Sequence, residues 1–190
     1  MNVLELHEID DFSRNLDRLD ICEHDIDVIT FDDGLYSQYK NIEVFRKFDM
    51  PLYFFISTDI VCPENVQQNE EVITAEEAHI RYRTNGDLSN YMKWSQIIEI
   101  SKMKNCYVGG HGHTHRDFRE LTIHTQHYGT TYEVSSMIRV FNEHNIGIDS
   151  FAFPYNYEAL GYRHFLKQFN VKKFFGSERI NIETIRAHNR

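Results

Sequence analysis

The sequence predicts an α/β fold in which a mostly parallel sheet is connected by helical crossovers. Segments rich in β-branched and aromatic residues alternate along the chain with segments whose apolar residues recur at helical spacing. Strands that alternate with helices in this way form parallel sheets, because a parallel connection has to return to the starting end of the sheet. A length of 190 residues fits one domain, so we expect residues 1–190 to form a single unit.

The first half of the chain carries two predicted strands with a helix between them. Residues 26–31 (IDVITF) are rich in β-branched residues and end at Asp-Asp-Gly, which is typical of a strand that stops at a loop. Apolar residues recur at helical spacing between positions 35 and 45. Residues 51–57 are apolar almost without alternation, which indicates a strand covered on both faces.

The second half repeats the alternation. The predicted helices cover 94–103, 134–141 and 162–169, and the predicted strands cover 106–109, 148–153 and 171–175, with a last short strand or turn near 180–185. Functional residues of parallel α/β sheets lie at the carboxyl ends of the strands. Unusual polar clusters stand at three such ends, directly after the first, third and fourth predicted strands.

Residues 62–92 interrupt this regular alternation. They carry acidic pairs and turn residues, and residues 74–77 (TAEE) match a capping box at the start of a helix. A long irregular excursion in a compact domain is usually a functional lid or a disordered loop. Both interpretations stay open.

Composition excludes several classes of partner. A net charge of −9 gives no basic surface to neutralise phosphates, so we expect no nucleic-acid partner, and a neutral substrate fits better. The acidic start of the chain lacks an apolar signal region, and the longest apolar run, residues 51–56, is too short for membrane insertion. The three cysteines are scattered, which is not a disulfide framework. We therefore expect a cytoplasmic protein.

A cluster of three histidines follows the predicted strand 106–109. His111, His113 and His115 alternate beside glycines, and three histidines within five residues favour a metal site over isolated core or surface histidines. Zinc accepts imidazole and carboxylate ligands, and a catalytic site needs three protein ligands with an open position for water. Alternate residues share a face in a strand, whereas the first and last of the three can converge in a turn.

A carboxylate from another strand end would complete such a site. Asp32 and Asp33 are adjacent, so they cannot easily both point at one ion. One would coordinate the metal and the other would accept a proton from the attacking water. Taken alone, Asp-Asp-Gly is explained as well by a turn that caps the next helix. The histidine cluster favours the metal site.

Three segments resemble the motifs of the polysaccharide deacetylases, the NodB-homology or carbohydrate esterase four family. Residues 30–34 (TFDDG) are identical to the first motif, and residues 109–117 (GGHGHTHRD) resemble the second, in which His-(Ser/Thr)-x-x-His follows a glycine. Residues 151–156 (FAFPYN) resemble the third, Arg-x-Pro-Tyr-Gly. The motifs occur in family order, and the resemblance extends over most of the chain.

The resemblance implies a distorted, incomplete (β/α) barrel that carries a metal-dependent deacetylase site. It assigns a divalent metal, Zn²⁺ first with Co²⁺, Mn²⁺ or Ni²⁺ as alternatives, to Asp33, His111 and His115. It makes Asp32 the general base, and it gives the backbone N–H of Tyr155 the role of holding the oxyanion of the tetrahedral intermediate. These roles agree with the chemistry of metal-assisted amide hydrolysis.

The chain departs from the family pattern at three motif positions. Gly112 stands where Ser or Thr is usual, Ala152 stands where the family has the Arg that orients the base, and Asn156 replaces Gly. These departures leave the predicted metal ligands in place. They put in doubt the rate of turnover and the usual polymer substrate.

The general acid is a further departure. The family supplies it from a Leu-x-His motif, and none follows the third motif here. His188 near the C-terminus is the expected acid because of its position, and His113 or Asp32 itself are the alternatives.

The expected function is removal of an N-acetyl or N-formyl group from an amino sugar or glycan precursor, in surface-polysaccharide biosynthesis. Two alternatives remain, a metal-bearing sugar-binding module with weakened catalysis and a hydrolase of a non-sugar amide in the same fold. The chain carries no G-x-S-x-G motif, P-loop or dinucleotide fingerprint that would support another enzyme class. The sequence does not predict the oligomeric state.

Overall fold

The strands form one parallel sheet in the computed structural model, which describes residues 1–10, 26–46 and 49–181. In chain order they are β1 (Asn2–Leu6), β2 (Ile26–Phe31), β3 (Leu52–Ile56), β4 (Cys106–Gly110), β5 (Ser150–Ala152), β6 (Lys173–Phe175) and β7 (Ile180–Asn181). The spatial order is β6-β5-β4-β3-β2-β1-β7, and each of these neighbouring pairs is parallel. The sheet ends at β6 and β7 without closing, which confirms the predicted incomplete (β/α) barrel.

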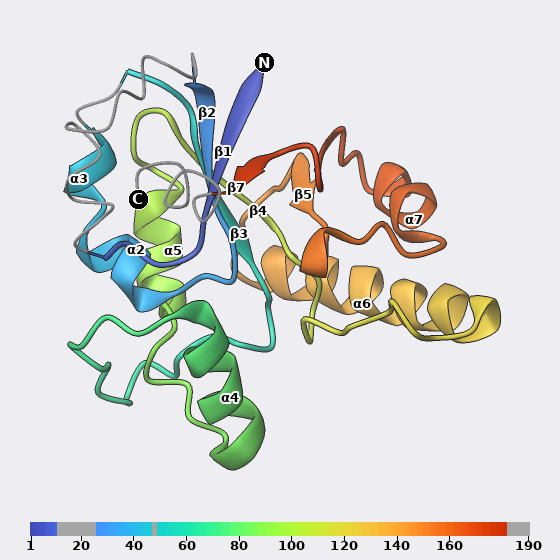
Figure 1. The fold of residues 1–190 in the computed structure, drawn as a ribbon, viewed down its shortest axis with the longest axis horizontal. Helices are drawn as coiled ribbons and strands as arrows, with labels where there is room; N and C mark the ends of the chain where they lie inside the picture. The colour runs from blue at the N-terminus through green and yellow to red at the C-terminus, as the bar shows by residue number, and fades with distance from the viewer. Residues whose placement is uncertain (11–25, 47–48, 182–190) are drawn as a thin grey trace, which may run out of the picture.

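Helices connect and cover the strands. They are α2 (Tyr36–Lys40), α3 (Glu43–Arg46), α4 (Ala75–Asn85), α5 (Trp94–Ile100), α6 (Ile123–Glu143), α7 (Tyr162–Gln168) and the 3-10 turn η2 (Pro154–Asn156). Figure 1 shows α2, α3 and α5 on one side of the sheet and α6 and α7 on the other, with α4 projecting at the bottom of the view. No helix of the described ranges is both long and apolar enough to cross a membrane.

Both faces of the sheet are buried, as the apolar run of β3 predicts. Leu52, Phe54 and Ile56 join the large core beneath the helices, whereas Tyr53 and Phe55 join a smaller cluster on the other face. Successive strand residues point to opposite faces, so a strand covered on both sides needs apolar residues at every position.

Several elements differ from the expectation, and the helix expected between positions 35 and 45 is two short helices, α2 and α3. β1 was not predicted, although it pairs with both β2 and β7. α6 begins at Ile123, well before the predicted start at residue 134, and the side chain of Thr122 caps it by accepting a hydrogen bond from the Thr125 backbone. The buried residues in its first half, such as Gln126 and Glu133, are mostly polar, so apolar periodicity could not reveal them.

The excursion 62–92 contains an ordered helix. Thr74 caps α4 by accepting a hydrogen bond from Glu77 N at 3.2 Å, in agreement with the predicted capping signal. The helix ends at Gly86, whose φ of 73° is the left-handed conformation that glycine tolerates. Residues 182–190, which include His188 and most of the last predicted strand, lie outside the described residues.

Candidate metal and catalytic site

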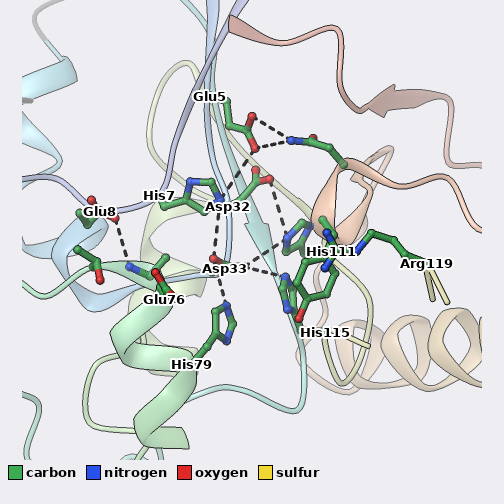
Figure 2. A pocket seen from close by; sticks show the side chains of 14 residues that line it. Glu5, His7, Glu8, Asp32, Asp33, Glu76, His79, His111, His115 and Arg119 are labelled. Atoms are coloured by element: carbon green, nitrogen blue, oxygen red, sulfur yellow. Dashed lines mark hydrogen bonds and ion pairs between the residues drawn. The ribbon is translucent and has the colours of Figure 1, made fainter. Parts of the chain in front are cut away.

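The carboxyl ends of the central strands and the first turn of α4 surround one cavity of about 430 Å³ (Figure 2). Most of its lining side chains are ionisable. The lining residues are Glu5, His7, Glu8, Asp32, Asp33, Thr74, Ala75, Glu76, His79, His111, His115, Arg119, Tyr155 and Asn156. Five of the six residues predicted for the site are therefore among them, and the sixth, His188, is not described.

The turn after β2 separates the two adjacent carboxylates. Asp33 has a φ of 71° and Gly34 a φ of 70°, so the chain reverses sharply as soon as the strand ends. Gly34 also packs closely, since a Cβ there would lie 3.1 Å from Cδ1 of Ile56. The reversal directs Asp32 and Asp33 to different partners.

Asp33 faces two histidines from the loop after β4. Its Oδ1 lies 3.1 Å from Nε2 of His115 and 3.3 Å from Nε2 of His111. The three ligand atoms lie within 4.8 Å of one another. Neither contact has the alignment of a hydrogen bond, so buried Asp33 Oδ1 has no aligned hydrogen-bond partner among the described residues. This is unusual for a buried carboxylate unless it serves as a ligand.

The tautomer of His111 suits coordination. Its Nδ1 lies 2.9 Å from the backbone oxygen of Ala152 and donates a hydrogen bond to it, so the lone pair of the neutral ring is on Nε2, toward Asp33. Burial alone would raise the pKa of Asp33, but His115, His111 and His79 around it hold that pKa well below its ordinary value. Two imidazoles and one carboxylate are ligands that Zn²⁺ accepts, so these residues fit a divalent metal.

Asp32 faces Arg179, the residue that precedes β7, while its Oδ2 lies 3.9 Å from Nε2 of His111. Arg179 Nη1 and Nη2 donate to Asp32 Oδ1 and Oδ2, each at 2.8 Å, in a two-pronged ion pair. Its side chain is fully buried. Burial alone would raise the pKa of Asp32, but the guanidinium outweighs it and holds that pKa below its ordinary value. Asp32 is therefore an ionised carboxylate with a fixed orientation beside the candidate metal ligands.

Known structures share this arrangement of strands. IcaB from Ammonifex degensii superposes with a TM-score of 0.67 at 18% identity, over 96% of this chain and 92% of that one. The BpsB deacetylase domain from Bordetella bronchiseptica gives a TM-score of 0.62 at 12% identity, over 95% and 94%. A de-N-acetylase from Aggregatibacter actinomycetemcomitans gives 0.61 at 12% identity, over 95% and 92%.

The chain has the fold of the NodB-homology deacetylases. No family model matches the sequence. No curated protein matches it either. At these identities the likeness establishes the fold, while the role of each residue depends on the geometry of this chain.

The geometry explains how the chain tolerates Gly112 in the segment that resembles the family's second motif. Buried Glu133 of α6 accepts hydrogen bonds from the backbone N–H groups of His113 at 2.6 Å and Thr114 at 2.9 Å. Gly112 has a φ of 79°, and a Cβ there would lie 2.9 Å from Oε2 of Glu133. Glycine is therefore required by the carboxylate that fixes the histidine loop.

Asn156, another of the departures, belongs to a network around buried Arg179. Arg179 holds both oxygens of Asp32, and its Nη2 also donates to Asn156 Oδ1 at 2.7 Å and to Glu5 Oε1 at 3.0 Å. Asn156 Nδ2 lies 3.2 Å from the Glu5 carboxylate. Asn156 has a φ of 54°, a conformation open to Gly and Asn, so the replacement of Gly keeps the backbone path.

Backbone strain is concentrated at the site. Among the described residues, the positive-φ positions that are neither Gly nor Asn are Asp33, His115 and Tyr155, with φ of 71°, 53° and 58°. Such conformations cost free energy and tend to occur where function requires them. The Tyr155 ring lies 4.8 Å from the His115 ring, centroid to centroid. The guanidinium of Arg119 lies over the Tyr155 ring, with its Cζ 4.6 Å from the ring centroid.

His113, the alternative acid, faces away from the cavity. Its Nδ1 lies 2.8 Å from Oγ1 of Thr58, and its ring packs edge-on against Tyr132 of α6. The alternative that makes His113 the acid is therefore not supported by the geometry of the cavity. Alternation along the loop turns the middle histidine outward, while the left-handed conformation of His115 brings its ring back to Asp33.

Sequence reasoning missed His7, which directly follows β1. Its Nε2 lies 3.9 Å from Asp33 Oδ2, and its side chain is 32% exposed, against 2% for His111 and 7% for His115. Burial alone would lower the pKa of His7, but Asp33, Asp32 and Glu5 together raise it above its ordinary value. Buried Gln38 fixes this end of β1 by donating to the His7 backbone oxygen at 2.6 Å. Sequence reasoning could have found His7 only by predicting β1, because a strand over residues 2–6 places residue 7 at a carboxyl end.

Proposed function

We propose that this protein is a metal-dependent hydrolase that removes an N-acetyl or N-formyl group from an amino sugar or a glycan precursor. The observation that carries the proposal is the buried Asp33–His111–His115 donor set beside Asp32, whose carboxylate Arg179 holds in place. A divalent cation bound by the three ligands would polarise the acyl carbonyl and lower the pKa of the attacking water.

The protein's own residues perform the remaining steps. Asp32 accepts the proton of the attacking water, since it is ionised and its two oxygens are fixed by Arg179. The backbone N–H of Tyr155 helps to hold the negative charge that develops on the acyl oxygen. The strained backbone at Tyr155 supports this role because preorganised donors commonly occur in such conformations.

The leaving amine needs a proton, and we assign its delivery to His7. Of the described histidines that line the cavity, His7 combines an exposed ring with an Nε2 directed at the Asp33 side of the site. An imidazolium can donate a proton near neutral pH. His188, the acid that the sequence favoured, remains the competing assignment.

An active enzyme is better supported than a sugar-binding module with weakened catalysis. That alternative depended on a missing arginine and a missing acid. Arg179 contacts the base from a different part of the chain, and His7 lies in the cavity. The arginine and the acid that are missing from the motif positions thus have substitutes, Arg179 and His7, in the same site.

Metal analysis combined with acetate release tests the proposal. The panel contains free, nucleotide-linked and oligomeric N-acetylated amino sugars, together with a non-sugar acetamide, because the cavity does not choose among them. We expect bound metal and release from at least one sugar. Metal without release from any sugar would favour the binding module, and release from the simple acetamide alone would favour a non-sugar amidase.

The metal ligands give the first mutational prediction. Asp33→Ala, His111→Ala and His115→Ala should each lose metal to a chelator that leaves the wild type loaded, because each removes one of three ligands. His113→Ala is the matched control, since its ring contacts Thr58 instead. Metal content after dialysis measures the effect. Loss of metal from His113→Ala and retention in His115→Ala would contradict the ligand assignment.

The acid assignment predicts a change in the pH–rate profile. His7 has to be protonated to act, so wild-type turnover should fall as pH rises through the titration of His7. His7→Ala should lower turnover by roughly 10²–10⁴-fold and remove this alkaline limb, with metal retained. His188→Ala should keep the limb. The reverse result would assign the acid to His188.

A further inference from the structure

His79 of α4 reaches the metal ligands from the excursion 62–92. Its Nε2 lies 3.2 Å from Asp33 Oδ2, the oxygen opposite the one that faces His111 and His115. Its ring stacks on the His115 ring at 4.5 Å with an angle of 16° between the planes. The side chain is 10% exposed, and Figure 2 shows it directed at Asp33 from below.

The other ring nitrogen of His79 is occupied by a buried tyrosine. Nδ1 lies 3.1 Å from the hydroxyl oxygen of Tyr91, which is fully buried at the end of the same excursion. His79 Nε2 has no aligned hydrogen-bond partner among the described residues, although Asp33 Oδ2 is at hydrogen-bond distance.

The chemistry of the two ends fixes the direction of the protons. Asp33 is an ionised carboxylate and can only accept, so the proton between Asp33 and His79 is on Nε2. A neutral ring protonated at Nε2 has its lone pair on Nδ1, and the Tyr91 O–H donates to it. Donation in such a relay would therefore run from Tyr91 through His79 to Asp33.

We propose that His79 and Tyr91 are positioning residues that hold Asp33 Oδ2 by a hydrogen-bond relay, so that Oδ1 alone is presented to the metal. His79 is not one of the three candidate ligands, Asp33, His111 and His115, whose ligand atoms all lie within 4.8 Å of one another. Hydrogen bonds to the free oxygen of a ligating carboxylate orient it and tune affinity. The proposal rests on the proposed function, because it concerns the metal of that site.

The relay also gives the excursion a role at the site. The N-terminus of α4 is tied to the loop after β1, since Glu8 Oε2 accepts a hydrogen bond from Ala75 N at 3.3 Å. Thr74, Ala75 and Glu76 line the same cavity as His79. A helix fixed at this end keeps His79 in contact with both Asp33 and His115, so α4 supports the metal ligands as well as forming a wall of the cavity.

Titration of the full chain with Co²⁺ tests the relay through affinity and the d–d absorption bands. His79→Phe keeps a ring against His115 and removes the donor, so the dissociation constant should rise roughly 10–100-fold with shifted bands, while saturating Co²⁺ still fills one site. His79→Gln places an amide N–H near the Nε2 position and should recover part of the affinity. Tyr91→Phe should give a smaller loss, and His124→Phe, an exposed histidine of α6, should give none.

Each remaining outcome counts against the relay. Affinity and bands unchanged in His79→Phe would overturn it, as would loss of metal as complete as in His115→Ala, which would make His79 a ligand. Equal losses in His79→Phe and His79→Gln would indicate a packing effect instead of a donor. A wild type that binds no Co²⁺ would overturn the proposed function together with the relay, whereas normal binding in every variant would overturn the relay alone.

Discussion

Replacing Asp32 with asparagine should lower deacetylation by roughly 10²–10⁴-fold, the usual effect of removing a positioned base, while metal content stays near that of the wild type. The carboxylate accepts from Arg179 through both oxygens, and it is Asp33 whose Oδ1 lies between His111 and His115. An amide at position 32 keeps one acceptor oxygen for Arg179 but cannot take up the proton of the attacking water. Turnover and metal content of the same preparation measure the two effects.

Asp33→Asn is the matched control for this prediction. It makes the same chemical change one residue along the chain, at the carboxylate that would ligate the metal. It should lose both metal and turnover, so the two variants separate base from ligand. Loss of metal in Asp32→Asn with retention in Asp33→Asn would reverse the roles of the two residues.

The parts of the site that were predictable from sequence come from short, continuous segments. Residues 30–34 and 111–115 each place chemistry directly after a buried strand, and the rule that functional residues follow strand ends was sufficient to find them. The metal candidates Asp33, His111 and His115 lie together as the motifs imply. The alternating pattern was sufficient to predict the parallel sheet.

The unpredicted parts depend on contacts between distant segments. Arg179 meets Asp32 across 147 residues of sequence, and Asn156 meets Glu5 across 151. A motif search looks for an arginine at position 152, whereas the structure supplies a guanidinium from Arg179, which directly precedes β7 on the far side of β1. Only the pairing of β1 with β2 and β7 brings these groups together, and local periodicity carries no information on such pairing.

These long-range contacts explain departures of the chain from the family motifs. Gly112 makes room for Glu133, and Asn156 both keeps a left-handed backbone and joins the network of Arg179. Gly112 and Asn156 are each accompanied by a polar partner from elsewhere in the chain, whereas the side chain of Ala152 packs in an apolar cluster. A motif position that changes in isolation would signal lost function, whereas one with a new buried partner indicates a rebuilt site.

The largest effect on stability is expected for Arg179→Met. The guanidinium is fully buried and pairs with Asp32 and Glu5, so its removal leaves two carboxylates without their cation. Breaking a buried ion pair from one side costs about 3–5 kcal/mol of unfolding free energy. Arg139→Met is the matched control, because its pair with Glu143 is largely exposed and worth about 0–1 kcal/mol.

The pH dependence identifies the cause of this loss. In the wild type the folded pKa of Asp32 is lowered, so its contribution to stability is present above its unfolded pKa and is lost as pH falls through the folded value. Without Arg179, burial dominates and raises the folded pKa, so Asp32 instead destabilises the fold as pH rises through its unfolded value. The pKa of Glu5 is already raised, with burial as the main cause and Asp32 as the next. The difference between wild type and Arg179→Met should therefore be largest at neutral pH and shrink as both carboxyls become protonated.

Urea denaturation with a chelator present, at neutral pH and near pH 4, measures this difference without a metal contribution. Arg179→Lys keeps the positive charge but loses the planar guanidinium that donates to both oxygens of Asp32. Its free energy of unfolding should therefore lie between those of the wild type and the methionine variant, while its turnover stays low. Retained turnover in Arg179→Lys would show that charge alone suffices and that the two-pronged geometry does not orient the base. A loss in Arg179→Met no larger than in Arg139→Met, or one independent of pH, would show that the buried carboxylates do not depend on Arg179 for their charge.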